Sequence, residues 1–545
     1  LENLITHQEF VSGNATVNFI QEHPELFTFV KRLDRGTRVL NFLADVTVNG
    51  HPDVKVKDPA KVFEKPVMPE FDQHKPYPEG TKDRLTRLGP DGFAAWLREE
   101  KKIHYTDTTL RDAHQSLLAT RMRTIDMLRA AEAFARLHPQ TFSMEVWGGA
   151  TFDVCIRFLR EDPWKRLAAL RKAVPNMLLQ MLIRGMNGVG YAAYPDNLIE
   201  KFVEKSWETG VDIFRIFDSL NWMDNIAPCI EMVRRRTQGL AEGALCYTGD
   251  ILDPKRTKYT LDYYVRLAKD LENAGAHILA IKDMSGLLKP YAAKELIAAL
   301  KDAVKIPVHL HTHDTSSLQP ATYLMAIEAG VDVVDCALGA LSGLTSQPNF
   351  NAVVEMMKFH ERENPYDIRS LNQFSDYWQA VREYYYPFES GLKAGAADVF
   401  RHEIPGGQYS NLKPQAVALG LGDKFEQIKD MYATVNEMFG DIVKVTPSSK
   451  VVGDMAQFMV ANDLTPEDVY TKGQHISFPE SVQQFFLGEL GQPEGGFPEK
   501  LQQIILKDKQ PFRDRPGKHL PPVDFDSELK AFRAQFGEDL TLLDF

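Results

Sequence analysis

Two apolar stretches of the sequence end in side chains that could bind a cation. HILAIKDMSG reaches Lys282, and PVHLHTHDTS, thirty residues further on, reaches His311 and His313. Residues i and i+2 of a β-strand point to the same side, so the two histidines face the same way, with His309 one step deeper on that face. Imidazole is a common ligand for divalent ions such as zinc and manganese. The pattern therefore predicts a metal site at the end of the second stretch.

A carboxylate would complete this ligand set, and TDTTLRDAHQS offers two. Asp112 follows the strand predicted there, whereas Asp107 lies earlier in that strand and should sit deeper. We therefore expect Asp112, His311 and His313 to bind the metal together. The alternative is that the two histidines are core residues whose nitrogens are satisfied by hydrogen bonds.

Lys282 has two interpretations. As a structural residue it would pair with Asp283 or another carboxylate, because a buried, unpaired ammonium is costly. Beside a cation, desolvation and the like charge would both lower the pKa of its amine. A neutral amine can react with carbon dioxide to give a carbamate, and that anion could bind the metal. The residues alone leave both interpretations open.

Two further polar positions are less clear from the sequence. Arg184, in LIRGMNGVGY, could hold a substrate carboxylate with its planar guanidinium, or it could pair with Asp218. The glycines around it lack the spacing of a dinucleotide-binding fingerprint. Thr446, in GDIVKVTPSSK, has the features of an ordinary loop residue, and nothing in the pattern marks it as catalytic.

The elements that would position these side chains alternate in type from residue 96 to 350. Helical spacing of apolar residues, as in IDMLRAAEAFARL, separates short apolar runs that are typical of buried parallel strands. About eight strand-then-helix units over about 250 residues predict an α/β fold, the (β/α)8 TIM barrel, whose sites lie at the carboxyl ends of the strands. The strand candidates are HYTDTT, FSMEVWGG, NMLLQMLIRG, DIFRIFDS, GALCYTG, HILAIKD, PVHLHTHD and VDVVDCALG.

The regions that flank the barrel have other patterns. Pro-rich, charged sequence over residues 56–85 favours extended, non-helical backbone, and a linker is predicted over residues 61–95. Aromatic-rich sequence with helical spacing predicts a helical extension over residues 351–510 that caps one mouth of the barrel. The last segment is Pro-rich before a short amphipathic helix, SELKAFRAQFG, and is expected to pack with the first segment rather than with the barrel.

Composition excludes several classes of function. The net charge of -12 is spread along the chain without a dense Lys/Arg tract, so nucleic acid is not an expected partner. No apolar run approaches the roughly 18 residues that span a bilayer, and no targeting segment is recognisable. The 4 cysteines form no CxxC pair, which suits a reducing compartment and argues against a zinc–thiolate site.

Long, ordered motifs give the chain a resemblance that runs over nearly its whole length. The motifs are DTTLRDAHQSLLATRMRT, SMEVWGGATFD, QMLIRGMNGVGY, CYTGDILDPKRTKY, AIKDM, HTHDTS, EIPGGQYSNLKPQA and GDIVKVTPSSKVVGDMAQFMV. Together they resemble the carboxyltransferase region of the pyruvate carboxylase family.

The resemblance implies a site and a reaction. The metal, zinc or manganese, would be held by Asp112, a carboxylated Lys282, His311 and His313. Pyruvate would be bound by Arg184, with Gln115 and Arg111 nearby, and Thr446 would carry a proton from the methyl group of pyruvate to biotin. The biotin ring would enter a pocket lined by Asp153, Tyr191 and Ser449. The reaction would transfer the carboxyl group of carboxybiotin to pyruvate, giving oxaloacetate.

The resemblance also implies a domain order and partners. Residues 1–30 look like the tail of a biotin carboxylase domain. Residues 31–60 and 511–545 look like two parts of a central tetramerisation and allosteric domain, which implies a small α+β linking domain built from both terminal segments. No ATP-binding domain and no AMKM-like biotin attachment sequence is found, so we expect a piece of a longer chain. Its partners would be a biotin carrier domain, a biotin carboxylase domain and further copies in a homotetramer. The compartment would be the cytoplasm in a bacterium or the mitochondrial matrix in a eukaryote.

Two positions depart from the family pattern. Ser285 stands where alanine is usual, which adds a hydroxyl near Lys282. Ser317 stands where glycine is usual, which removes a residue that tolerates positive φ. Neither change removes a proposed role.

Three alternatives remain. The α chain of oxaloacetate decarboxylase, or a transcarboxylase subunit, would share the barrel, the metal ligands and the biotin chemistry. A metal-dependent aldol-type lyase or acyl-CoA condensing barrel would share the RD pair and the HxH motif, but Lys282 and the Thr446 segment argue against it. A scaffold without activity would not need the intact set of candidate ligands.

Overall fold

The computed structural model describes residues 2–28, 35–49, 63–389 and 391–545. The chain divides into two compact units, residues 1–63 and 64–545. The described part of the first unit is helical. Its elements are α1 (Glu2–Ile5), α2 (Gln8–Val11), α3 (Phe19–Glu22), the 3-10 turn η1 (Pro24–Phe27) and α4 (Arg35–Asn49).

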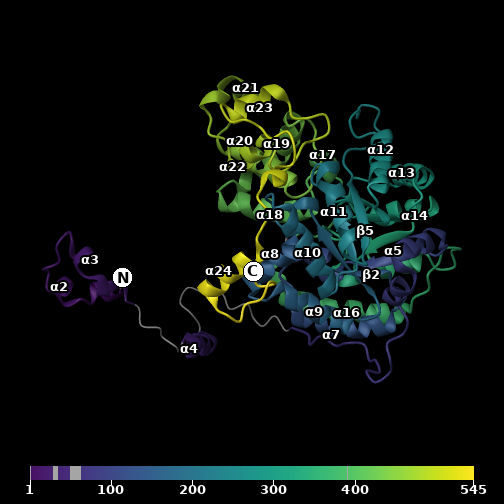
Figure 1. Ribbon diagram of the computed structural model, residues 1–545, viewed down its shortest axis with the longest axis horizontal. Helices are drawn as coiled ribbons and strands as arrows, with labels where there is room; N and C mark the ends of the chain where they lie inside the picture. The colour runs from purple at the N-terminus through teal and green to yellow at the C-terminus, as the bar shows by residue number, and fades with distance from the viewer. Residues whose placement is uncertain (1, 29–34, 50–62, 390) are drawn as a thin grey trace. The chain divides into compact units, whose positions relative to one another are not determined.

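The second unit is built on a closed barrel of eight parallel strands in sequence order, as predicted (Figure 1). Apart from the half-buried Leu182 in β3, every strand residue is buried, which explains why the apolar runs are continuous rather than alternating. The strands are β1 (His104–Asp107), β2 (Ser143–Gly148), β3 (Leu178–Ile183), β4 (Ile213–Ile216), β5 (Leu240–Cys246), β6 (Ile278–Asp283), β7 (Val308–Thr312) and β8 (Val333–Cys336).

Helices cover the outside of the barrel, one or more after each strand. Most bury an apolar stripe against the strands, because their apolar residues recur at helical spacing. The main helices are α7 (Thr124–Leu137), α9 (Pro163–Ala173), α10 (Asp196–Thr209), α11 (Met223–Arg236), α12 (Leu261–Asn273), α13 (Pro290–Ala303), α14 (Gln319–Glu328) and α16 (Ile368–Tyr384); shorter ones are α6 (His114–Leu117), α8 (Gly149–Val154) and α15 (Phe350–Met356).

One helix closes the amino-terminal end of the barrel. Helix α5 (Thr81–Glu99) buries Leu85, Phe93 and Leu97 in a cluster with the first residues of several strands, including Leu178 and Ile213. Burying these apolar side chains stabilises the fold, because each Å² of apolar surface removed from water contributes about 25 cal/mol. The amino-terminal end of the barrel is therefore sealed by α5, and the candidate ligands lie at the opposite, carboxyl-terminal end.

The interior of the barrel holds a buried ionic layer. Arg215 pairs with Glu242 and with Asp335, and His309 lies 2.6 Å from Asp335 and 3.1 Å from Glu242. All four side chains are fully buried. Buried charges are tolerated when they are paired in this way. The layer lies below the strand ends that carry the candidate ligands.

A second apolar core lies in the helices that follow the barrel. Figure 1 shows α19–α23 grouped to one side of the barrel. The Thr446 segment links this helical group to the barrel, because Ser448 donates to the carbonyl of Ser219 after β4 and Lys444 donates to Thr248 after β5. The helices are α17 (Val399–His402), α18 (Gly406–Ala418), α19 (Phe425–Met438), α20 (Ser448–Ala461), α21 (Pro466–Lys472), α22 (Glu480–Leu487), α23 (Glu499–Leu506) and α24 (Phe525–Phe536).

The terminal segments give a partial view of the expected linking domain. Arg515 pairs with Asp196 at 2.6 Å, and Asn197 exchanges hydrogen bonds with Val523, so the last segment lies along α10. In the described parts of residues 1–60 and 511–545 the regular elements are helices. Residues 29–34 and 50–60 of the first segment lie outside the described residues, and the domain boundaries stay predictions. No helix in the described ranges is long and apolar enough to cross a membrane.

Candidate metal centre and active site

Three candidate metal ligands converge at the carboxyl-terminal ends of β1 and β7. Asp112 lies in the π-helical turn η2 (Thr109–Ala113) that follows β1, and His311 and His313 lie at the end of β7. The Nε2 atoms of the two histidines are 3.1 Å apart, and each lies 3.3 Å from Oδ2 of Asp112. All three residues are buried.

This triangle has the size of one face of a metal coordination shell. Ligands about 2.0–2.1 Å from a tetrahedral ion lie about 3.3–3.4 Å from one another, and octahedral ligands at about 2.1 Å lie about 3.0 Å apart. The observed separations of 3.1–3.3 Å fall in this range. Two imidazoles and a carboxylate are also a donor set that suits zinc or manganese. The three side chains therefore fit a divalent ion.

Hydrogen bonds fix the tautomers of both histidines. Nδ1 of His311 lies 2.6 Å from Oδ2 of Asp335, and Nδ1 of His313 lies 2.6 Å from the carbonyl oxygen of Thr345. Both Nδ1 atoms donate, so in the neutral form of each ring Nε2, which faces Asp112, is the nitrogen whose lone pair a metal could use. Burial, followed by the charge of Lys282, holds the pKa of His311 well below its usual range, which keeps this imidazole neutral.

Asp112 is held as a carboxylate by its neighbours. Arg111 Nη1 donates to its Oδ1 at 2.7 Å, and Gln347 Nε2 donates to its Oδ2 at 2.8 Å. Burial alone would raise the pKa of Asp112, but the charge of Arg111 and the contacts with His313 and His311 outweigh burial and lower it well below its usual value. The side chain is therefore ionised and can bind a cation.

Arg111 links the metal centre to the substrate side of the site. It also donates to Gln115 Oε1 at 3.0 Å and to the buried carboxylate of Glu145, while its Nε has no hydrogen-bond partner among the described residues. Gln115 follows in α6 and is half-buried. Arg111 and Gln115 therefore lie together, and Gln115 keeps its amide NH2 for a further acceptor.

Lys282 is buried in β6, with its Nζ 5.8 Å from the centre of the Phe217 ring. Among the described residues no carboxylate oxygen lies within 4.0 Å of that nitrogen, and Asp283 instead accepts from Leu287, Leu288 and Thr312. Burial lowers the pKa of the Lys282 amine. The structural pairing with Asp283 is therefore absent, and the geometry favours a functional interpretation.

Arg184 lies at the end of β3 and makes no ion pair with Asp218. Its Nη1 donates to the carbonyl oxygens of Val189 and Gly190, and its guanidinium carbon lies 4.6 Å from the centre of the Tyr191 ring. Its Nε is buried without a hydrogen-bond partner in the described chain. Asp218 instead accepts from the backbone of Leu220 and Trp222 and from Asn225, so the guanidinium is available to an anion.

Thr446 and Ser449 lie together at the start of α20, with their hydroxyl oxygens 3.4 Å apart. Thr446 is half-buried, and Ser449 is buried. A narrow pocket is lined by Arg184 and Tyr191 on one side and by Pro447, the next residue after Thr446, on the other. The structure thus brings the Thr446 segment over the same end of the barrel as Arg184.

The remaining biotin-pocket candidates are exposed. Tyr191 is 53% exposed and Asp153, on α8, pairs with Arg157 at 3.4 Å. Both influence Arg184 electrostatically, so they lie on its side of the site. Their assignment to a biotin pocket stays a prediction.

The two departures from the family pattern have structural consequences. Ser285 donates to the carbonyl oxygen of Glu403 at 3.2 Å, which ties the loop after β6 to the segment before α18. Ser317 has a φ of 63°, in the left-handed region that favours glycine. The added hydroxyl at 285 is therefore satisfied, whereas the side chain at 317 introduces backbone strain.

Asp335 and Gln347, which hydrogen-bond to the candidate ligands His311 and Asp112, were not identified from the sequence. Asp335 belongs to β8 and touches the metal site only through His311. Gln347 comes from a loop after β8, where its Oε1 accepts from Thr108 and its amide reaches Asp112. The period-two position of Asp335 in VDVVDC was the one available signal, since it directs the side chain into the barrel.

The fold and the convergent ligands define an α/β-barrel protein with a candidate metal centre at the open end of the barrel. Two family profiles match the chain: "HMGL-like" over residues 210–377, within the barrel, and "Conserved carboxylase domain" over residues 399–544, in the helices that follow.

Comparison with known proteins identifies a family within this class of α/β-barrel proteins. Pyruvate carboxylase of Bacillus subtilis is 53% identical over 541 residues, which are 99% of this chain and 47% of that protein. Mitochondrial pyruvate carboxylase of Homo sapiens is 45% identical over 99% of this chain and 46% of its own length. The carboxyl transferase domain of Rhizobium etli pyruvate carboxylase, solved with pyruvate and biocytin, is 51% identical, with a TM-score of 0.88 over 94% of this chain and 85% of that one.

The chain belongs to the pyruvate carboxylase family, and it corresponds to the carboxyl transferase region. It spans about half the length of the curated relatives that it matches. The resemblance seen in the motifs and the predicted barrel are therefore confirmed. The roles of single residues are not tested by these similarities.

Proposed function

We propose that this chain catalyses the transfer of a carboxyl group from carboxybiotin to pyruvate, giving biotin and oxaloacetate. The observation that carries the proposal is the convergence of Asp112, His311 and His313 at the carboxyl-terminal end of the barrel, with Arg111 beside them and with Lys282, which has no carboxylate partner among the described residues. The relative solved with pyruvate and biocytin supports the same substrates here. An oxaloacetate decarboxylase chain is the alternative, and the curated relatives favour the carboxylase.

Asp112, His311 and His313 would hold a zinc or manganese ion. Such an ion, when bound, acts as a Lewis acid that stabilises negative charge developing on the oxygen of the substrate carbonyl. The three side chains need little rearrangement to bind it, because their ligand atoms already lie 3.1–3.3 Å apart.

Lys282 would supply a fourth ligand after carboxylation. Its neutral amine would add to carbon dioxide, forming a new N–C bond and releasing one proton to solvent. Support comes from the lowered pKa of the buried amine and from the absence of a carboxylate partner in the part of the chain that the structure describes. The resulting carbamate would place an anion beside the metal in place of the neutral amine, which is favourable electrostatically.

Arg184 and Thr446 would act on pyruvate directly. The guanidinium of Arg184, whose Nε has no partner in the described chain, would hold the carboxylate of pyruvate and stabilise the enolate. The hydroxyl of Thr446 would take a proton from the methyl group and pass one to the ring nitrogen of biotin as carbon dioxide leaves. Gln115 and Arg111 would orient the substrate, and the methyl carbon would then bond to carbon dioxide.

Biotin would reach the site on a carrier domain outside this chain. Asp153, Tyr191 and Ser449 would line its pocket. Asp153 and Tyr191 influence Arg184 electrostatically, and the hydroxyl of Ser449 lies 3.4 Å from that of Thr446. In the whole protein we expect a biotin carboxylase domain to charge the carrier, and a homotetramer to bring the domains together. Residues 1–30, 31–60 and 511–545 would be the parts of this chain that connect to those domains.

The compartment follows from the source of the chain. We expect the cytoplasm in a bacterium and the mitochondrial matrix in a eukaryote, as one relative is named mitochondrial.

Oxaloacetate decarboxylation with free biotin tests the proposal, with pyruvate release followed on protein of known metal content. We expect turnover that rises with biotin and is lost in Thr446→Ala while metal content and fold are unchanged. Ser481→Ala is a suitable control, since its hydroxyl bonds Asp454 on α20 away from the site. Undiminished turnover in Thr446→Ala would remove the proton-transfer role, and biotin-independent turnover would favour a different reaction.

Carbon-13 bicarbonate tests the carbamate separately. A carbamate resonance in wild-type protein that is absent in Lys282→Met is expected, and its presence in both would place the modification elsewhere.

A further inference from the structure

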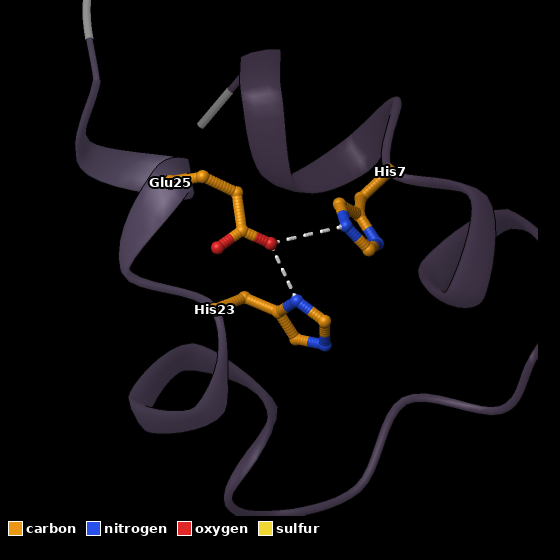
Figure 2. Close-up of side chains that lie close together, drawn as sticks. All are labelled: His7, His23 and Glu25. Atoms are coloured by element: carbon orange, nitrogen blue, oxygen red, sulfur yellow. Dashed lines mark hydrogen bonds and ion pairs between the residues drawn. The ribbon is translucent and has the colours of Figure 1, made fainter.

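A second group of metal-ligating side chains lies in the first unit, in residues 2–28. His7 precedes α2, His23 follows α3, and Glu25 lies in η1. Figure 2 shows both imidazoles facing one carboxylate oxygen, Oε1 of Glu25, at 2.6 Å from Nδ1 of His23 and 3.7 Å from Nε2 of His7. One ligand atom from each residue lies within 4.8 Å of the other two.

Packing fixes the two rings. Phe19 is 4% exposed, and its ring centre lies 5.1 Å from that of His7 and 4.7 Å from that of His23. The two imidazole centres are 4.5 Å apart. The nitrogens are therefore held near one another by an apolar contact that does not depend on a metal, which lowers the entropic cost of binding one.

Each histidine can present only one nitrogen to an ion. Nδ1 of His7 is buried and has no hydrogen-bond partner among the described residues, so Nε2 is the nitrogen that faces Glu25. Nε2 of His23 lies 3.4 Å from a carboxylate oxygen of Glu9. A carboxylate on the far nitrogen is the usual partner of a metal-bound histidine, because it orients the ring and makes the near nitrogen more basic.

We propose that Nε2 of His7, Nδ1 of His23 and a carboxylate oxygen of Glu25 bind a divalent transition ion, with Zn²⁺ as the probe. Two imidazoles and one carboxylate match the ligands that Zn²⁺ takes when a position is left for water. The Glu25 side chain is 57% exposed, so it can turn to open its 2.6 Å contact with His23 to the roughly 3.3 Å between two ligands of one ion. The ion replaces the proton of His23 Nδ1, which is released to solvent.

This site is separate from the candidate active site and does not depend on the proposed function. It lies in the unit formed by residues 1–63, whereas Asp112, His311 and His313 belong to residues 64–545. A chain with both sites filled would bind two ions, and a chain with only the barrel site would bind one.

Equilibrium dialysis of the whole chain against Zn²⁺, after removal of metal by a chelator, counts the sites. We expect wild type to bind one ion more than His23→Ala. Glu25→Gln preserves a hydrogen bond to His23 but removes a proposed ligand. Loss of a residue that only supports a ligand weakens metal binding about 10–100-fold, so loss of this ligand should weaken Zn²⁺ binding at the extra site by at least about tenfold. The control is His519→Ala, because His519 lies 2.8 Å from Asp514 and this histidine–carboxylate pair has no third candidate ligand among the described residues.

Equal counts and affinities in wild type, His23→Ala and Glu25→Gln would overturn the proposal. A loss in His23→Ala with none in Glu25→Gln would also overturn it, because the loss would then come from disturbed packing on Phe19. Far-ultraviolet circular dichroism on each variant shows whether helix content is retained.

Discussion

Replacing Asp335 by asparagine tests how the metal centre is held. Oδ2 of Asp335 lies 2.6 Å from Nδ1 of His311 and keeps the proton on that nitrogen. The negative charge of Asp335 orients the His311 ring and raises the basicity of its Nε2. Asparagine removes this charge. Loss of such a partner typically weakens metal binding about 10–100-fold, or about 1.4–2.8 kcal/mol at 1.4 kcal/mol per tenfold.

The same substitution also disturbs the ionic layer in the barrel. Asp335 pairs with Arg215 and with His309, and breaking a buried pair costs about 3–5 kcal/mol. A matched control must lose stability without touching a ligand. Asp332→Asn meets this need, since buried Asp332 pairs with Lys301 at 2.7 Å and contacts none of the three candidate ligands.

Competition between the stripped protein and a chromophoric chelator for Zn²⁺ measures the affinity. Each variant is made with His23→Ala so that one site is titrated. We expect Asp335→Asn to bind about 10–100-fold more weakly and Asp332→Asn to stay within about threefold of the parent. Unchanged affinity in Asp335→Asn would refute the role of this contact, and equal losses in the two variants would attribute the effect to lower stability.

Three further predictions concern stability, and urea unfolding measures each. Ser317→Gly relieves the φ of 63° and should stabilise the fold by about 0.5–1 kcal/mol, so a loss of stability would contradict the strain. Burial lowers the pKa of His138 to about 4. Between pH 6.5 and 4 the unfolded chain then binds a proton that the folded chain does not, so stability falls as the pH falls through this range. His138→Gln should lose about 2 kcal/mol less than wild type between pH 7 and 5, and equal losses would contradict the pKa. Phe93→Ala should cost about 3–5 kcal/mol because Phe93 is fully buried, whereas Phe359→Ala should change stability by about 0.5 kcal/mol or less because Phe359 is 90% exposed; similar losses would refute the seal at the barrel floor.

The barrel could be predicted from the sequence because each strand is buried on both faces. All eight apolar runs proved to be strands. The boundary of β5 was less accurate: the run GALCYTG begins at Gly243, but the strand begins at Leu240. The start was missed because a carboxylate such as Glu242 is typical of a loop. In the barrel its charge is paired with Arg215 on the neighbouring strand, which the local sequence does not show.

The candidate ligands could be found in part. His311 and His313 stand out because two histidines at period two end an apolar run, and Asp112 follows a strand that the barrel places nearby. Asp335 and Gln347 act through another residue, so their roles depend on strand register and loop path rather than on local pattern. For Thr446 the residues alone gave no signal, and its predicted role comes from the family resemblance.

The position of Asp335 links the stability of the barrel to the geometry of its metal centre. One carboxylate holds Arg215 and His309 in the interior and His311 at the open end. TIM barrels usually fill this space with layers of apolar side chains, which could not fix the tautomer of a ligand above them. The buried ionic layer therefore has a use that an apolar core would not supply, although such a core could be equally stable. Thr446, unlike Asp335, lies outside the barrel interior, on a segment that bonds to the loop after β4. Its substitution should therefore alter turnover and leave the metal affinity and the stability unchanged.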